Sequence, residues 1–282
     1  MYKTLKKNIP KPVKNFIRIF TNRLDKVRRV FLRFPQGSVF SSDLNLEANI
    51  LLNKKSSPIA RVKNEALMPV GLLAFDVGSY TGNSIPRLRA MGYSEIVCFE
   101  PDPDNYSALV RSFRGQPGLT FFNYAVSDRS GEVLTLTSNR DCPWLNTLNK
   151  DWIEDTRHEQ FFNRIEKYSV ETITLDDALS FYGRYPSYIK IDVEGHELNV
   201  LKGLSFKPKL LSFEWISEKV EKNISAVRYL QSSEFTEFYV CLQEDLPKLE
   251  KPGLDFNACI DFLRKLHIED IENNKGGNIF CR

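Results

Sequence analysis

The sequence has few of the features that mark secreted or membrane-spanning proteins. Its five cysteines are scattered and form no C-x-x-C pair, which argues against a disulfide framework or zinc site and favours reduced thiols in a cytoplasmic protein. No apolar run reaches the roughly eighteen residues that a membrane-spanning helix needs. The basic N-terminus also lacks the apolar core and cleavage site of a signal peptide. With 42% hydrophobic and 27% charged residues, the 282-residue chain has an ordinary globular composition.

The first 34 residues differ from the rest of the chain in charge. They contain eleven Lys and Arg and one acid, a net charge of +10, which leaves −7 for the remainder because the whole chain carries +3. Apolar side chains recur every three or four residues from Ile9 to Phe34, which predicts a basic amphipathic helix from about residue 12 to Pro35. Two uses stay open: peripheral membrane contact through residues 12–34, or packing of the apolar stripe on the body. We interpret residues 1–70 as a basic helical arm and connector.

From residue 71 onward, strand-like and helix-like patterns alternate. The predicted helices are 83–91, 103–114, 195–203 and 218–232. The predicted strands are 72–77, 95–99, 119–126, 187–192, 209–215 and 235–242, and the final GGNIFCR is predicted as a strand at or near a sheet edge. This alternation is typical of the α/β class and predicts a doubly wound, mostly parallel sheet over residues 71–282.

One segment, 138–169, interrupts the alternation. It is long and polar, yet it is rich in large aromatic residues, including Trp144 and Trp152, which argue against disorder. We interpret it as a lid or substrate-binding insertion. A structural cover over a sheet edge is the alternative.

The end of the first predicted strand carries a turn that suits a ligand. LLAFDVGSYTGN (72–83) runs from an apolar strand through Asp76 to Gly78 and Gly82 before the next helix. Ligands of open parallel sheets bind beyond the carboxyl ends of strands, where glycine lets the backbone approach them closely. The G-x-x-x-G spacing matches neither the dinucleotide fingerprint nor the phosphate loop, so an ordinary tight turn is the alternative.

The next two predicted strands bring further acids to the same edge. Glu100 ends the second strand, twenty-two residues after Gly78, where an acid is placed to accept both hydrogen bonds of a ribose diol. Ser127 and Asp128 follow the third, where a carboxylate is able to bind the adenine amino group. These strand ends predict a nucleoside site. They do not predict a phosphate site, because the turns after the first two strands contain no basic residue and the third contains only Arg129.

Six blocks of the chain resemble the FkbM-type methyltransferases in order and spacing, over about residues 70–282. They are FDVGSYTGN, CFEPDPDNY, YAVSDRSGEV, ETITLDDAL, IKIDVEGHELNVLKG and LLSFEW. The resemblance implies a class I methyltransferase (Rossmann-like) fold that uses S-adenosylmethionine, and usually methylation of an oxygen. The family's substrates include sugars of bacterial glycans and hydroxyls of natural products. We therefore expect an O-methyltransferase acting on a saccharide, glycan or glycolipid, cytoplasmic and peripheral at the membrane. Methylation of a small natural product, or nucleic-acid binding through the arm, is the alternative.

The resemblance also implies which residues hold the cofactor. Asp76 and the two glycines match the loop beside the methionine moiety, Glu100 matches the ribose acid, and Asp128 matches the adenine-side position. One departure is Tyr80, where many members have Asn, although a subset reads G-x-Y-x-G as this chain does. The complete expected cofactor set is Asp76, Val77, Gly78, Ser79, Gly82, Asn83, Glu100, Pro101, Ser127, Asp128 and Asp192.

The stretch YIKIDVEGHELNVLKG (188–203) is expected to supply catalytic residues. Asp192 ends the predicted strand, where the transferring methyl is expected, and His196 has an ordinary pKa near neutrality. Either is a candidate general base for the acceptor hydroxyl. Glu214, near the tip of the next predicted strand, is the third catalytic candidate. Pairing of Glu214 with Lys190 across neighbouring strands is its structural alternative.

Two further acids in this stretch allow other interpretations. Glu197 is interpreted mainly as a residue that caps a helix start, and Glu194 stays undecided. A divalent metal ion held by Asp192, Glu194 and Glu214 is an alternative that we do not favour. Such a carboxylate set would suit magnesium or calcium, not zinc.

Overall fold

The computed structural model describes residues 72–282, apart from residues 155, 243–246, 248 and 271–275. The basic helix predicted in residues 1–70, with its membrane contact at 12–34, lies outside the described residues. Within the described part, none of the helices combines the length and apolar character needed to cross a membrane.

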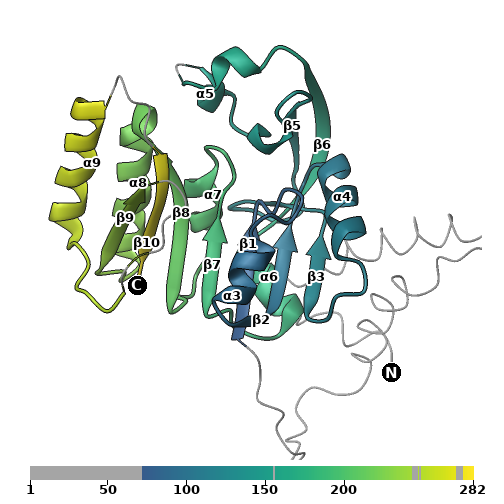
Figure 1. The fold of residues 1–282 in the computed structure, drawn as a ribbon, viewed down its shortest axis with the longest axis horizontal. Coiled ribbons are helices and arrows are strands. Elements are labelled where there is room, and N and C mark those ends of the chain that lie inside the picture. Colours follow the sequence, from purple (N-terminus) through teal and green to yellow (C-terminus); the bar gives the residue numbers. More distant parts are fainter. Residues whose placement is uncertain (1–71, 155, 243–246, 248, 271–275) are drawn as a thin grey trace, which may run out of the picture. The chain divides into compact units, whose positions relative to one another are not determined.

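A seven-stranded sheet forms the centre of the described chain (Figure 1). In spatial order its strands are β3 (Leu119–Phe122), β2 (Tyr93–Phe99), β1 (Leu72–Val77), β7 (Tyr188–Ile191), β8 (Leu210–Ile216), β10 (Gly276–Cys281) and β9 (Phe238–Leu242). The first five are parallel to one another, whereas β10 runs antiparallel to both β8 and β9. The strand order reverses between β1 and β7, which is where ligands of doubly wound sheets bind. The predicted fold class is confirmed, and the final strand lies next to the edge strand β9.

The strands are apolar because both faces of the sheet are buried. Alternate residues of β1 point to opposite faces, and Ala74 and Phe75 are both fully buried. Helices α3 (Ile85–Ala90) and α4 (Pro103–Phe113) pack on the Ala74 face. Helix α6 (Leu175–Tyr182) packs on the other face, where the rings of Phe75 and Tyr182 lie 6.2 Å apart.

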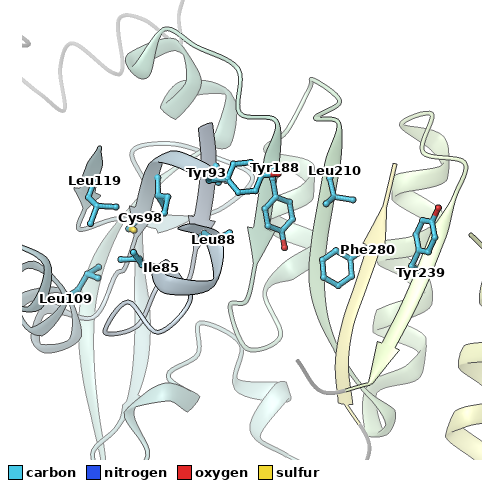
Figure 2. Packing of buried hydrophobic residues seen from close by; sticks show 12 residues of the cluster. Ile85, Leu88, Tyr93, Cys98, Leu109, Leu119, Tyr188, Leu210, Tyr239 and Phe280 are labelled. Atoms are coloured by element: carbon cyan, nitrogen blue, oxygen red, sulfur yellow. The ribbon is translucent and has the colours of Figure 1, made fainter. Parts of the chain in front are cut away.

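A row of aromatic rings connects the two halves of the sheet on the Ala74 face. The ring of Tyr188 lies 5.6 Å from that of Tyr93 and 6.4 Å from that of Phe280, with Leu88 of α3 in the same cluster (Figure 2). Residues two positions nearer the carboxyl edge on the same strands share this face. The packed aromatic row therefore directs Lys190 of β7 to the same side of the sheet.

The remaining helices are α7 (Glu197–Lys202), α8 (Val220–Ser232) and α9 (Phe256–Asp270). The four predicted helices are confirmed with boundaries shifted by at most two residues, but α6 and α9 were not predicted. The sequence holds start and stop signals for α6: Thr174 accepts a hydrogen bond from the Asp177 amide at 3.1 Å, and Gly183 ends the helix at a φ of 79°.

The predicted strand 119–126 is wrong, because it forms two strands in different sheets. β3 ends at Phe122, and β4 (Ala125–Val126) belongs to a second sheet of order β4-β6-β5, with β5 (Val133–Asn139) and β6 (Ile165–Ile173). The Asn123 side chain donates to the carbonyls of Glu100 and Pro101 at 2.8 and 3.1 Å and so holds the chain between β3 and β4 beside the end of β2.

The predicted insertion lies between β5 and β6, which pair as an antiparallel hairpin. It contains the 3₁₀ helices η2 (Pro143–Leu145) and η3 (Glu159–Phe161) and the short helix α5 (Lys150–Ile153). Figure 1 shows this hairpin and α5 beyond the end of the central sheet toward which the β7 arrow points. The insertion thus stands over the carboxyl edge of the parallel strands.

Candidate functional site

A cavity of about 530 Å³ lies at the carboxyl edge of the central sheet. Its described lining comes from the ends of β1, β2, β7, β8 and β10, from α3, and from the insertion. Cavities of about 300–1,000 Å³ are typical of small-molecule sites. The cavity is therefore large enough for a nucleoside cofactor with part of an acceptor.

The turn after β1 is pressed against the ends of both neighbouring strands. The amides of Gly78 and Ser79 both donate to the carbonyl of Phe99 at 3.0 Å. Gly78 has a φ of +81°, and a Cβ there would overlap the carbonyl oxygen of Asp192. Only glycine fits this position, because any side chain would push β1 and β7 apart at the switch point.

Glu100 is a buried carboxylate at the tip of β2 that lines the cavity. Its two oxygens accept hydrogen bonds from the amides of Tyr80 at 2.8 Å and Asp102 at 2.9 Å. Burial raises the pKa of Glu100 to about 8, although both amide hydrogen bonds lower it. Since each carboxylate oxygen accepts two hydrogen bonds, a ligand is able to donate to Glu100 as well.

Asp76 is fully buried and lies outside the described residues that line the cavity. One of its oxygens accepts a hydrogen bond from Ser84 at the start of α3, and Lys190 Nζ lies 4.0 Å from the other. Among the described residues that other oxygen, Oδ1, has no hydrogen-bond partner. Asp76 thus contacts both Ser84 at the start of α3 and Lys190 of β7.

Lys190 forms an ion pair with Asp192, and not with Glu214, which was the structural alternative for that residue. The Nζ of Lys190 lies 2.8 Å from Oδ2 of Asp192, because residues two apart on a strand share a face. Burial would lower the pKa of Lys190, but the charges of Asp192 and Asp76 raise it above its usual value. Lys190 is therefore a fixed positive charge beside the predicted catalytic aspartate.

Three carboxylates meet at the end of the cavity near β7 and β8. Asp192, Glu194 and Glu214 each offer an oxygen, and these oxygens all lie within 4.8 Å of one another. All three residues line the cavity. Burial raises the pKa of Glu194 and Glu214 well above the usual value, and the charge of Asp192 raises both further. We refer to these residues as the acid cluster.

His196 lies apart from the acid cluster. Its Nε2 is 3.0 Å from Ser127 Oγ, and that hydroxyl donates to Asp128 at 3.1 Å. Burial lowers the pKa of His196 to about 4, which keeps the ring neutral at physiological pH. None of these three residues is among the described residues that line the cavity. The structure brings two of the predicted catalytic residues together, Asp192 and Glu214, and places the third, His196, beside Ser127 and outside the described cavity lining.

The turn between Asp192 and α7 explains why His196 faces elsewhere. Glu194 and Gly195 have positive φ values of 52° and 91°, so the chain reverses direction within two residues. Glu197 Oε1 accepts a hydrogen bond from the Gly195 amide at 3.0 Å, which confirms its predicted role at the helix start.

Seven of the predicted cofactor residues line the cavity: Val77, Gly78, Ser79, Asn83, Glu100, Pro101 and Asp192. The other four are not among the described lining residues: Asp76, Gly82, Ser127 and Asp128. Burial would raise the pKa of Asp128, but hydrogen bonds from Ser127 and others outweigh it and lower the pKa. Asp128 is held by protein groups, and its predicted contact with adenine stays a prediction.

Sequence reasoning missed several residues of the cavity wall. Asn278 of β10 lies opposite Glu214 in the strand register, and it lines the cavity. The sequence feature that could have identified Asn278 is its position as a polar residue within the final predicted strand, GGNIFCR. From the insertion, Trp144 and Asn146 line the cavity, and Asn146 Nδ2 donates to Asp102 Oδ2 at 2.9 Å. Trp144 remains 54% exposed.

The insertion also forms hydrogen bonds with the turn that contains Glu194. Thr147 Oγ1 donates to the carbonyl of Glu194 at 2.6 Å, and Asn149 Nδ2 donates to the carbonyl of Gly195 at 2.8 Å. The Trp152 indole is 2% exposed and lies where a Cβ on Gly195 would be. The insertion therefore holds both the Glu100 end and the acid cluster end of the cavity.

Comparisons with known proteins agree with this geometry. A family model described as the methyltransferase FkbM domain matches residues 76–243. The 2-O-methyltransferase NoeI of Sinorhizobium fredii is 30% identical over 139 residues, 45% of this chain and 55% of that protein. The hexuronic acid methyltransferase AglP of Haloferax volcanii is 29% identical over 133 residues, 46% of this chain and 49% of that protein. The chain thus spans about half the length of the curated relatives it matches.

Among solved structures, the precorrin-6y C5,15-methyltransferase of Geobacter metallireducens aligns with 89% of this chain and 94% of its own. The TM-score is 0.39 and the sequence identity is 11%, which is too low to carry an argument about function.

Proposed function

The chain belongs to the FkbM methyltransferase family, and from that premise we propose that it transfers a methyl group from S-adenosylmethionine to a hydroxyl group of a saccharide. The observation that carries the proposal is the cavity at the switch point, which has Glu100 at one end and the acid cluster at the other. By their names, one relative methylates an oxygen and the other a hexuronic acid, which is a sugar. These names support an oxygen acceptor on a saccharide.

The residues at the Glu100 end fit the nucleoside part of the cofactor. Glu100 would accept hydrogen bonds from the ribose hydroxyls, and Pro101, Val126 and Leu136, which line the cavity, would provide an apolar surface for the base. The turn at Gly78 and Ser79 lines the cavity beside Glu100 and is where the methionine moiety would lie. When bound, S-adenosylmethionine supplies an electrophilic methyl group on a sulfonium centre.

The acid cluster end suits the acceptor. A hydroxyl is a poor nucleophile while it keeps its proton, so the protein must orient its oxygen and accept that proton. Asp192 and Glu214 line the cavity and are the acceptors that we propose for this hydrogen bond and proton. Lys190 holds the Asp192 carboxylate in place at 2.8 Å. For His196 we propose a positioning role, because its ring joins α7 to Ser127.

For the domain organisation, we propose that residues 71–282 form the methyltransferase domain and that 138–169 covers its cavity. The aromatic residue at 144 and the hydrogen bonds from Thr147 and Asn149 support this role for the insertion. A cover over the reacting groups excludes water that would compete with the acceptor hydroxyl.

Calorimetry with S-adenosylhomocysteine tests the cofactor half of the proposal. At pH 9, where Glu100 with its pKa of about 8 is ionised, wild-type protein is expected to bind it. Glu100→Gln is expected to bind roughly tenfold to a hundredfold more weakly, because a hydrogen bond to a charged group contributes about 1.5–3 kcal/mol. Glu132→Gln is the matched control, since Glu132 lies outside the described residues that line the cavity, and it should bind like wild type.

A labelled-methyl assay tests the acceptor half. Extracts are separated into saccharide, lipid, nucleic-acid and small-molecule fractions and are incubated with labelled S-adenosylmethionine and the full chain. Label is expected in the saccharide fraction, and Asp192→Asn should reduce it at least tenfold. Absence of S-adenosylhomocysteine binding by wild type, or label confined to nucleic acid or small molecules, would contradict the proposal.

A further inference from the structure

The acid cluster carries more negative charge than its neighbours balance. Asp192 lies at the end of β7, Glu194 lies in the turn that follows, and Glu214 lies near the end of β8. Among the described residues, Lys190 forms an ion pair with only one member of this cluster, Asp192. Carboxylates that are removed from water and placed beside one another repel, so such groups need protons or a cation between them.

One atom of the cluster lacks a partner altogether. Among the residues that the structure describes, Glu194 Oε2 has no hydrogen-bond partner, although the residue is only 8% exposed. Its carboxylate lies beside those of Asp192 and Glu214 and borders the cavity. Its backbone is held by the hydrogen bond from Thr147 at 2.6 Å. A buried acceptor without a donor is costly, and a bound cation would satisfy it.

We propose that Asp192, Glu194 and Glu214 bind a hard divalent cation, of the class of Mg²⁺, Mn²⁺ or Ca²⁺, at the acceptor end of the cavity. The donors are all carboxylate oxygens, which these ions prefer, whereas zinc prefers nitrogen and sulfur. An ion that binds oxygens at about 2.1–2.6 Å bridges oxygens up to roughly 4.2–5.2 Å apart. The separations within 4.8 Å match that span.

The cation site and the proposed function are separable. Binding of the ion follows from the three carboxylates alone, but a catalytic role for the ion rests on the proposed methyl transfer. There, the positive charge would lower the pKa of an acceptor hydroxyl and make its proton easier to remove. The remaining coordination positions would be open to water or to the acceptor.

Manganese titration followed by electron paramagnetic resonance tests the site, because the spectrum of free Mn²⁺ is lost on binding. The full chain is freed of metal with a chelator and titrated without cofactor or acceptor. Wild type is expected to show one saturable site that Mg²⁺ or Ca²⁺ competes for. Glu194→Gln and Glu214→Gln are each expected to weaken Mn²⁺ binding at least tenfold, and Asp192→Asn serves as a second variant at the third ligand.

Glu197→Gln is the matched control. It removes one charge from the same turn, but the Glu197 carboxylate is occupied by the Gly195 amide at 3.0 Å. Mn²⁺ affinity should change less than threefold, with circular dichroism showing that every variant is folded. No saturable site in wild type, or an equal loss in Glu197→Gln, would overturn the proposal, because the second result indicates a diffuse negative field and not a bound ion.

S-adenosylhomocysteine binding on the same samples separates the two proposals. Protein that binds S-adenosylhomocysteine and no Mn²⁺ overturns the cation site and leaves the proposed function standing. Protein that binds Mn²⁺ and no S-adenosylhomocysteine supports the cation site and contradicts the function. If S-adenosylhomocysteine displaces Mn²⁺, the cluster serves the amino group of the cofactor, and the cation site is overturned.

Discussion

The central sheet and the insertion at 138–169 form different walls of the same cavity, and they hold their site residues by different contacts. On the sheet side, backbone lies directly against backbone, as where Gly78 meets the carbonyl of Asp192. On the insertion side, side chains reach the backbone of the 192–196 turn: the Trp152 indole covers Gly195, and Thr147 donates to Glu194. A substitution on the sheet side therefore displaces backbone, whereas a substitution on the insertion side removes only a side-chain contact.

The largest effect is expected where backbone meets backbone. Gly78→Ala places a Cβ against the carbonyl oxygen of Asp192 at a φ of +81°, and we expect a loss of about 3–5 kcal/mol of unfolding free energy. Gly115→Ala is the control, because Gly115 has a φ of +76° and nothing lies within 4 Å of its Cβ position. It should cost about 1–2 kcal/mol. Urea denaturation measures both, and equal losses would show that the close contact with β7 has no energetic weight.

The second effect concerns the insertion. Trp152→Ala is expected to cost about 3 kcal/mol in urea denaturation, because the buried indole packs in a small cluster with Leu145 and Ile216. Trp144→Ala, at a position that is 54% exposed, should change stability by less than about 0.5 kcal/mol.

A double-mutant cycle between Gly195 and residue 152 measures how strongly the Trp152 side chain restricts the space at Gly195. Gly195→Ala is expected to be destabilising in wild type and less so by about 1–3 kcal/mol in a Trp152→Gly background, because both the indole and the Trp152 Cβ, which lies 2.6 Å from the added Cβ, are then absent. Additive losses from the two substitutions would indicate that Trp152 does not limit the space at Gly195.

The smallest effect depends on pH and tests how the far end of the insertion is anchored. Arg157 Nε and Nη2 donate to the two oxygens of Glu218 at 2.8 and 2.7 Å. Burial would raise the pKa of Glu218, but the hydrogen bonds from Arg157 outweigh it and lower the pKa below its ordinary 4.5. A lowered folded-state pKa stabilises the protein above the unfolded-state value, and that stabilisation is lost as pH falls.

Arg157→Gln is therefore expected to lose about 1–2 kcal/mol at pH 7, with the gap to wild type narrowing below about pH 4.5. Urea denaturation at several pH values measures this. Arg140→Gln is the control, since Arg140 pairs with the exposed Asp104 and Glu166, and its urea midpoint should match that of wild type. A gap that stays constant down to pH 3 would contradict the proposed anchor.

Several features of the site were open to prediction because they depend on local pattern alone. Glu100 and Asp192 each follow an apolar strand, and the carboxyl ends of parallel strands meet at one edge. The strand periodicity also placed Lys190 and Asp192 on one face, where the structure pairs them at 2.8 Å. In the same way, Glu197 could be identified as a helix-start residue from its place before an amphipathic segment.

Other features depended on contacts between segments far apart in the sequence. The break at Asn123 was not predicted, because the residues of 119–126 favour a strand throughout and only the carbonyls of Glu100 and Pro101 hold the chain there. Asn278 reached the cavity only because β10 pairs with β8 in a register that sets it opposite Glu214.

By itself, the sequence determined the strand–helix alternation of the central sheet, with four of its helices, and the acids at the strand ends, since period and turn chemistry act over a few residues. The direction of each side chain was decided by the tertiary structure. His196 follows Asp192 by four positions, yet the positive φ of Glu194 and Gly195 turns it to Ser127. The same turn brings Glu194 to Glu214, because backbone dihedrals and packing against the insertion, not spacing along the chain, set where a side chain points.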